Sequence, residues 1–133
     1  MNVLRWICVI PAAYLGYYLA LIGGMAALAL AESFCPPEML VSGMCTAEYM
    51  RSAEKVLFLL FPGIAAVLVV LLPALVAPAR KFAVACVFLA VGSVIATVMG
   101  VSLGEWMVLG FALLCGIVTA WAVYAHQNRT AMQ

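Results

Sequence analysis

The sequence predicts an all-α integral membrane protein, in which residues 1–133 form one transmembrane domain folded as a four-helix bundle with up-down-up-down topology. Of the 133 residues, 69% are hydrophobic and 8% are charged, whereas about 25% of the residues in a soluble domain are charged. Four long runs lack Asp, Glu, Lys and Arg, and each can supply the roughly 20 apolar residues of a membrane helix. The helices are expected at about 6–31, 53–77, 82–103 and 105–126.

The first helix, 6–31, is predicted from the uncharged run between Arg5 and Glu32. A positive residue before an apolar run is also typical of a cleaved signal peptide. The apolar core of a signal peptide has only about 7–15 residues, however, and this run is longer. We therefore expect a span that is retained in the protein.

The second helix, 53–77, is expected to end before Pro78, because proline disfavours helical geometry in the residue that precedes it. Thr46 or Ser52 is the candidate N-cap. Pro62 lies within the run and predicts a kink, since proline removes one backbone hydrogen bond. Only residues 78–81 separate this run from the next, so the second and third helices should form an antiparallel hairpin.

The third helix, 82–103, is followed at once by the fourth, 105–126. Ser102 and Glu105 have the spacing of a capping box, in which a hydroxyl and a carboxylate satisfy the first backbone N–H groups of a helix. This pair predicts the start of the fourth helix. His126 is expected at the membrane interface, because the C-terminal end of a helix dipole stabilises a cation.

The orientation follows from the positively charged residues, because Lys and Arg near span ends favour the cytoplasmic side. With four spans, one side carries Arg5, Arg80, Lys81 and Arg129. The other side carries Arg51 and Lys55. We therefore expect both termini in the cytoplasm and the 32–52 loop outside it, in a bacterial cytoplasmic (inner) membrane.

The outer loop contains two of the five cysteines, Cys35 and Cys45. Disulfides persist on the extracytoplasmic side, and a bridge here would close a ring of about 11 residues, worth about 2.8 kcal/mol in the chain-entropy model. We predict that this disulfide forms as a structural staple. Cys8, Cys86 and Cys115 lie in spans and are expected to pack as small apolar residues.

Small residues recur every four positions in three of the predicted helices. Residues four apart share a helix face, and small side chains there let membrane helices approach closely. We therefore predict a compact bundle with the third helix near its centre. The helix-packing residues are Gly16, Ala20 and Gly24 in the first helix, Gly92, Ala96, Gly100 and Gly104 in the third, and Ala112, Gly116 and Ala120 in the fourth.

Residues that could carry out chemistry are scarce. No Ser-His-Asp set, CxxC pair, phosphate-binding loop or cluster of metal ligands is visible, and the spans hold no ionisable carboxylate or amine for coupled transport. No cofactor, metal or nucleic acid is therefore expected. Tyr14, Tyr17 and Tyr18 form a cluster in the first helix, where packing or interfacial positioning is favoured over a ligand pocket.

The favoured function is a non-enzymatic membrane protein that acts through protein–protein binding, as an accessory subunit of a membrane complex or as a protector against a membrane-active partner. Expected partners are the lipid bilayer and a membrane or extracytoplasmic protein, or a second copy of the chain. An oligomeric small-solute channel or uncoupled carrier is the alternative. An extracytoplasmic thiol-disulfide or lipid-modifying enzyme comes third.

The outer loop is the candidate docking element, on protein or on the lipid surface, because it combines a disulfide with apolar side chains. Its candidate contact residues are Met39, Leu40, Val41, Met44, Tyr49 and Met50.

Overall fold

The computed structural model describes the backbone of residues 2–41 and 44–131, and the side chains of residues 5–40 and 45–129. The helices are α1 (Asn2–Ile7), α2 (Val9–Ser33), the short 3-10 helix η1 (Pro37–Met39), α3 (Glu48–Val76), α4 (Lys81–Leu103) and α5 (Trp106–Ala131). The strands are β1 (Leu40–Val41) and β2 (Met44–Cys45).

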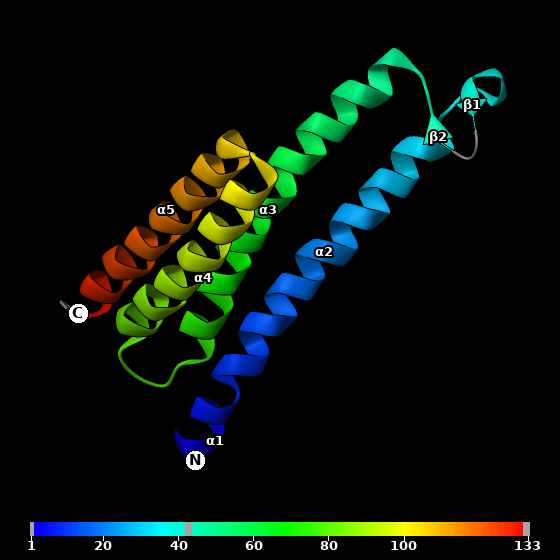
Figure 1. The fold of residues 1–133 in the computed structure, drawn as a ribbon. Helices are drawn as coiled ribbons and strands as arrows, with labels where there is room; N and C mark the ends of the chain where they lie inside the picture. Colours follow the sequence, from blue (N-terminus) through cyan, green and yellow to red (C-terminus); the bar gives the residue numbers. More distant parts are fainter. Residues whose placement is uncertain (1, 42–43, 132–133) are drawn as a thin grey trace.

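Four helical segments in the described ranges are long and apolar enough to cross a membrane, at Arg5–Ser33, Glu48–Val76, Lys81–Leu103 and Trp106–Arg129. The predicted all-α four-helix architecture is confirmed. The chain alternates in direction from one span to the next, and the traced chain begins and ends at the same end of the bundle (Figure 1). We call this the termini end, and the opposite one the loop end.

The bundle consists of two antiparallel hairpins, α2–α3 and α4–α5, that meet along α3. The first hairpin reaches further at the loop end, where it carries the two short strands beyond the turn between α4 and α5 (Figure 1). The prediction that the third span lies near the centre is wrong. Instead α3 packs against α2, α4 and α5, while α2 packs chiefly against α3.

The best-packed part of the bundle lies toward the termini end. Val70 and Ala74 of α3, Ala85 of α4 and Ala120 of α5 form one buried cluster. A second cluster joins α2, the end of α3 and α4 through Val9, Ala77 and Val84. These small side chains let three helices approach one another without bulky residues between them.

Several predicted boundaries shift. The first span is divided at Cys8, because Pro11 has no N–H for the carbonyl of Ile7 and its ring conflicts with that carbonyl. The second span begins at Glu48, five residues earlier than predicted, and the fourth continues to Ala131. As predicted, α3 ends just before Pro78, with Ala77 in an extended conformation (ψ 127°).

The predicted caps are wrong. Ala47 opens α3, and its methyl side chain cannot make a cap bond. The Thr46 hydroxyl donates to the Met39 carbonyl instead of capping the helix, and Ser52 already lies inside α3. Ser102 does not open α5, since it lies in the last turn of α4 and its hydroxyl donates to the Val98 carbonyl at 2.7 Å.

Glycine and glutamine shape the ends of α4. Gly104 stops the helix with a left-handed backbone (φ 73°), and the N–H of Glu105 then donates to the Gly100 carbonyl. At the other end, the backbone N–H of Phe82 donates to the side-chain carbonyl of Gln127, at 3.1 Å. This bond joins the start of α4 to the last turns of α5.

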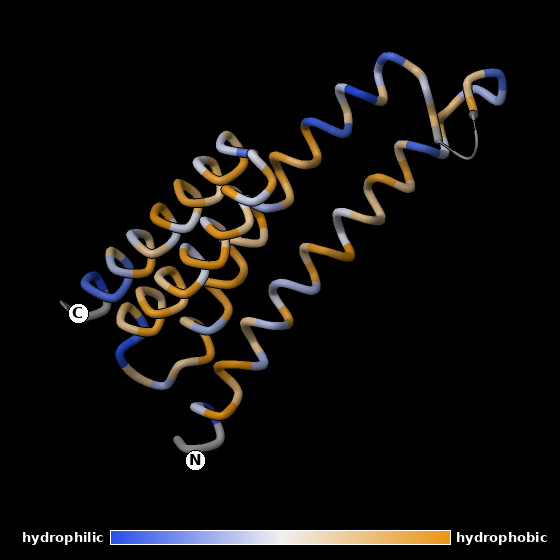
Figure 2. Tube along the Cα trace, in the orientation of Figure 1, coloured by the Kyte–Doolittle hydropathy of each residue, from blue (hydrophilic) through white to orange (hydrophobic). Residues whose placement is uncertain are grey.

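The hydropathy of the residues along the chain follows the order of spans and connections. The trace is mostly hydrophobic through the four spans and becomes hydrophilic where the 77–80 link meets α4, at the end of α5 and at the loop end of α3 (Figure 2). The loop end of α3 contains Glu48, Arg51, Glu54 and Lys55, which are all exposed. About two turns of α3 therefore extend beyond its apolar run, as the early helix start requires.

Candidate functional site

The candidate site is the polypeptide between α2 and α3. The ends of these helices narrow the predicted 32–52 loop to residues 34–47, and from here on outer loop means these residues. It begins where the N–H of Cys35 donates to the Glu32 carbonyl and ends the helix. Pro36 is extended (ψ 137°), and Pro37 starts the single turn η1, a position that needs no N–H. Two adjacent prolines thus turn the chain away from α2 in a fixed direction.

The outer loop then folds back on itself as a two-stranded antiparallel hairpin that the sequence did not predict. Leu40 pairs with Cys45 and Val41 with Met44. Such short strands have little stability of their own in water. The hairpin therefore depends on additional bonds within the loop.

The disulfide between Cys35 and Cys45 is present, with Cα atoms 6.0 Å apart. It joins the end of α2 to the second strand, and its predicted pairing is confirmed. A second connection is made by the Met39 carbonyl, which accepts hydrogen bonds from both the Thr46 hydroxyl (2.8 Å) and the Thr46 backbone N–H (3.0 Å). Both connections lie at the open end of the hairpin, where they join its strands to each other and to the end of α2.

Two side chains at the start of α3 are buried. Met50 is only 2% exposed and Ala47 only 5%. The assignment of Met50 to the docking surface is therefore wrong. The first turn of α3 buries this side chain, and covering a methionine in apolar surroundings is worth about 1.5–3 kcal/mol.

Four large apolar side chains remain exposed on and beside the outer loop. Phe34 is 73% exposed, and Met39, Leu40 and Tyr49 are each close to half exposed. We call these four residues the loop patch. Val41 and Met44, which were also predicted to dock, have side chains outside the described residues. Phe34 was not predicted, although a large apolar residue directly after a polar helix end was a usable signal.

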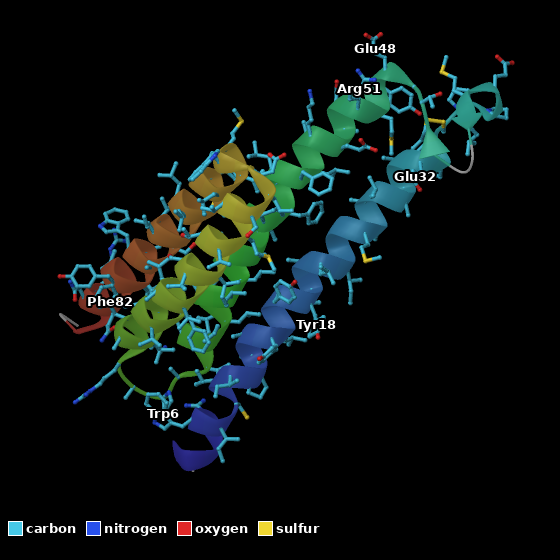
Figure 3. All side chains as sticks on the ribbon, in the orientation of Figure 1. Trp6, Tyr18, Glu32, Glu48, Arg51 and Phe82 are labelled. Carbon is cyan, nitrogen blue, oxygen red and sulfur yellow. A yellow bond between two sulfur atoms is a disulfide. The ribbon has the colours of Figure 1, made fainter. Side chains whose placement is uncertain are left out.

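Charged residues lie at the same end of the molecule as the loop patch. Glu32, Glu48 and Arg51 are all exposed and lie at the loop end of the α2–α3 hairpin (Figure 3). An apolar centre with a charged rim is the usual composition of a protein-binding surface.

The predicted series of small residues at four-residue spacing, which we call ladders, differ in what they contact. In α2, Gly16 and Ala20 are buried, Gly24 lies against Phe61, and a Cβ on Gly16 would stand 3.0 Å from the backbone of Leu68. In α5, Ala112, Gly116 and Ala120 are buried. A Cβ on Gly116 would stand 2.7 Å from the Cδ1 atom of Leu89.

The ladder in α4 is only partly a packing surface. Gly100 packs on Leu109 and Ala96 is half-buried, but among the described residues no atom apart from the adjacent backbone lies within 4 Å of a Cβ placed on Gly92 or Gly104. Gly104 is a turn residue instead. Each four-residue step passes a full turn by about 40°, so Gly92 lies about 80° around the helix from Gly100 and outside that contact.

The membrane-spanning part offers little that could hold a ligand. Two depressions of about 290 Å³ lie on the surfaces of α4 and of the α4–α5 hairpin, with mainly apolar linings. Cys86 borders the second, and Cys8 is exposed. Within the described ranges, no group of three or more His, Cys, Asp or Glu residues could hold a metal ion.

Comparison of the chain with protein-family models, with curated proteins and with solved structures finds no match.

Proposed function

We propose that this chain is a non-enzymatic integral membrane protein that works by binding another protein, as an accessory subunit of a membrane complex or as a protector against a membrane-active partner. The outer loop is the binding element in this proposal. Its partner is a membrane or extracytoplasmic protein with an apolar surface flanked by charges.

One observation carries the proposal: four large apolar side chains, three in the disulfide-bonded loop and Tyr49 beside it, are exposed at the far end of the α2–α3 hairpin. A loop that is already ordered loses little conformational entropy when it binds. The Cys35–Cys45 disulfide and the two Thr46–Met39 bonds supply such order at residues 35, 39, 45 and 46. Exposed aromatic and methionine side chains are also enriched at protein interfaces.

The proposed location is a bacterial cytoplasmic membrane, with both termini in the cytoplasm. The distribution of Lys and Arg supports this orientation. The outer loop would then lie in a compartment where its disulfide is stable.

Site-specific photocrosslinking in the membranes of cells that naturally make the protein tests the proposal. A benzophenone amino acid replaces Leu40, in the loop patch. In the matched control it replaces Met107, which is 78% exposed at the loop end of α5. We expect one discrete protein adduct from position 40 and none from position 107.

A double substitution, Met39→Ser with Tyr49→Ser, should abolish that adduct without unfolding the helices, because both side chains are exposed. Adducts with lipid alone at position 40 would contradict the proposal and indicate a loop that lies on the bilayer surface. Equal protein adducts at both positions would also contradict it, since they would reflect crowding at the membrane and not recognition by the loop.

A further inference from the structure

The outward face of α2 carries a regular series of large side chains. Tyr14, Tyr18, Leu21 and Met25 follow one another at intervals of four, three and four residues and are all exposed. This is the a/d spacing of a coiled-coil seam. We call these four residues the α2 seam.

The α2 seam lies on the side of the helix away from α3. Residues two positions apart are about 200° apart around a helix, so Tyr14 and Tyr18 point almost opposite to Gly16, which contacts the backbone of Leu68 in α3. Because α2 packs chiefly on α3, no helix of this chain competes for the seam.

The centre of the seam lies near the middle of the bilayer. Tyr18 is 13 residues after Arg5 and 14 before Glu32, or about 20 Å along the helix from either charge. Figure 3 shows it between Trp6 and Glu32. The neighbouring α3 gives the same depth, since Leu68, opposite Gly16, is 13 residues after Lys55 and 12 before Arg80.

At this depth the tyrosine hydroxyls need a partner. Tyr17 and Tyr18 are both about half exposed, and their rings contact each other edge to face, with centroids 5.7 Å apart. Among the residues whose side chains the structure describes, neither hydroxyl has a hydrogen-bonding group in reach. Hydrocarbon offers none, and the nearest headgroups are about 15 Å away, half the thickness of the hydrocarbon core.

We propose that two copies of this chain associate in parallel through the α2 seam, with Tyr17 and Tyr18 hydrogen-bonding across the interface near the membrane midplane. A second copy fits for two reasons. It has the same orientation in the bilayer, so a two-fold axis along the membrane normal brings the same residues to the same depth. A phenol hydroxyl both donates and accepts, so two tyrosines satisfy each other.

The pairing would also fix the register of the two helices. A single polar layer in an apolar seam disfavours any alignment that leaves a polar group unpaired. Leu21 and Met25 would fill the following layers toward the loop end. The proposal concerns a different face from the outer loop and holds whether or not that loop binds another protein.

Disulfide cross-linking in membranes tests the geometry. Cys8, Cys86 and Cys115 are replaced by Ala, the Cys35–Cys45 disulfide is kept, and a single cysteine is introduced by Leu21→Cys. The matched control is Leu19→Cys, which is 52% exposed and differs from Leu21 in depth by only about 3 Å, but lies about 160° away around the helix. With copper phenanthroline we expect at least tenfold more covalent dimer from position 21. Equal yields, or none from position 21, would overturn the proposal.

The hydroxyls are tested separately, because tyrosine-to-phenylalanine changes keep the rings. In mild detergent, sedimentation equilibrium should show a dimer whose dissociation constant rises about three- to tenfold in the Tyr17→Phe, Tyr18→Phe double variant, as expected for one or two interhelical hydrogen bonds. Tyr124→Phe, on α5, should leave it unchanged. A monomeric parent protein, or an unchanged constant in the double variant, would contradict the proposal. The Met39→Ser, Tyr49→Ser variant should still form dimers, which separates this result from the loop experiment.

Discussion

The two hairpins of this protein use the same small-residue pattern in different ways. In α2–α3, Gly16 lies against backbone, with the carbonyl carbon and oxygen of Leu68 3.0 Å from the position of a Cβ. In α4–α5, Gly100 and Gly116 face side chains instead, Leu109 and the tip of Leu89. The first hairpin therefore includes a direct approach of two main chains at Gly16, whereas leucines fill the space beside Gly100 and Gly116 in the second.

This difference shows that the atoms opposite a glycine decide how much a larger side chain at that position would destabilise the bundle. A main chain cannot move without shifting a whole helix, whereas the end of a leucine can rotate into neighbouring space. The two hairpins should accordingly respond differently to substitution. The α2–α3 pair also carries the outer loop, so its close contact positions the proposed binding element.

The largest expected effect comes from Gly16→Leu. The new side chain meets the backbone of Leu68 and must push α2 away from α3, at a cost of about 3 kcal/mol or more. Gly92→Leu is the control, because its side chain enters open space. Thermal unfolding in mild detergent, followed by circular dichroism, measures both. Similar melting temperatures for the two variants would show that α2 and α3 are not in main-chain contact.

Removal of the disulfide should have the next largest effect. In the Cys35→Ser, Cys45→Ser variant we expect a loss of about 2.8 kcal/mol from chain entropy, confined to the loop end of the α2–α3 hairpin. Hydrogen exchange should accelerate in residues 36–46 and stay unchanged in the α4–α5 turn. Faster exchange in both turns would mean that the two hairpins do not open independently.

Alanine substitutions at Gly16 and Gly116 compare the two hairpins with a smaller added side chain. Gly16→Ala should destabilise by about 1 kcal/mol, because backbone is in the way. Gly116→Ala should be neutral or stabilise by up to about 1 kcal/mol, since the Leu89 tip can move and alanine favours helix over glycine. Distance alone would predict the reverse order, because the atom nearest to an added Cβ is 2.7 Å away at Gly116 and 3.0 Å away at Gly16. Melting temperatures in the reverse order would contradict this explanation of the contacts.

The smallest effect concerns single hydroxyls. Thr46→Val removes the side-chain bond to the Met39 carbonyl and should cost about 1 kcal/mol of loop stability, visible as faster protease cleavage within residues 36–46. Ser102→Ala should have no comparable effect on the α4–α5 turn, because that hydroxyl bonds to its own helix. Equal cleavage of the Thr46 variant and the parent would show that the backbone N–H bond alone holds the loop.

The sequence predicted what depends on hydropathy and local chemistry. Uncharged runs gave the four spans, Pro78 the end of α3, and the cysteine positions the disulfide. It failed where tertiary partners decide. Thr46 bonds within the loop and does not cap α3, Met50 turns inward, and α3 occupies the centre because of which faces meet. No local pattern shows which residue will stand opposite Gly16 or Gly92.

Cysteine labelling with a membrane-impermeant maleimide most directly tests the central claim, that the outer loop lies across the membrane from both termini and the 77–80 link. Single cysteines are introduced by Ser52→Cys, Ala79→Cys and Asn128→Cys, at exposed positions, in a chain that lacks Cys8, Cys86 and Cys115. In intact bacterial cells whose outer membrane admits the reagent, we predict labelling at position 52 alone, with positions 79 and 128 reacting only after the cytoplasmic membrane is opened. Labelling of position 52 together with either of the others would contradict the account.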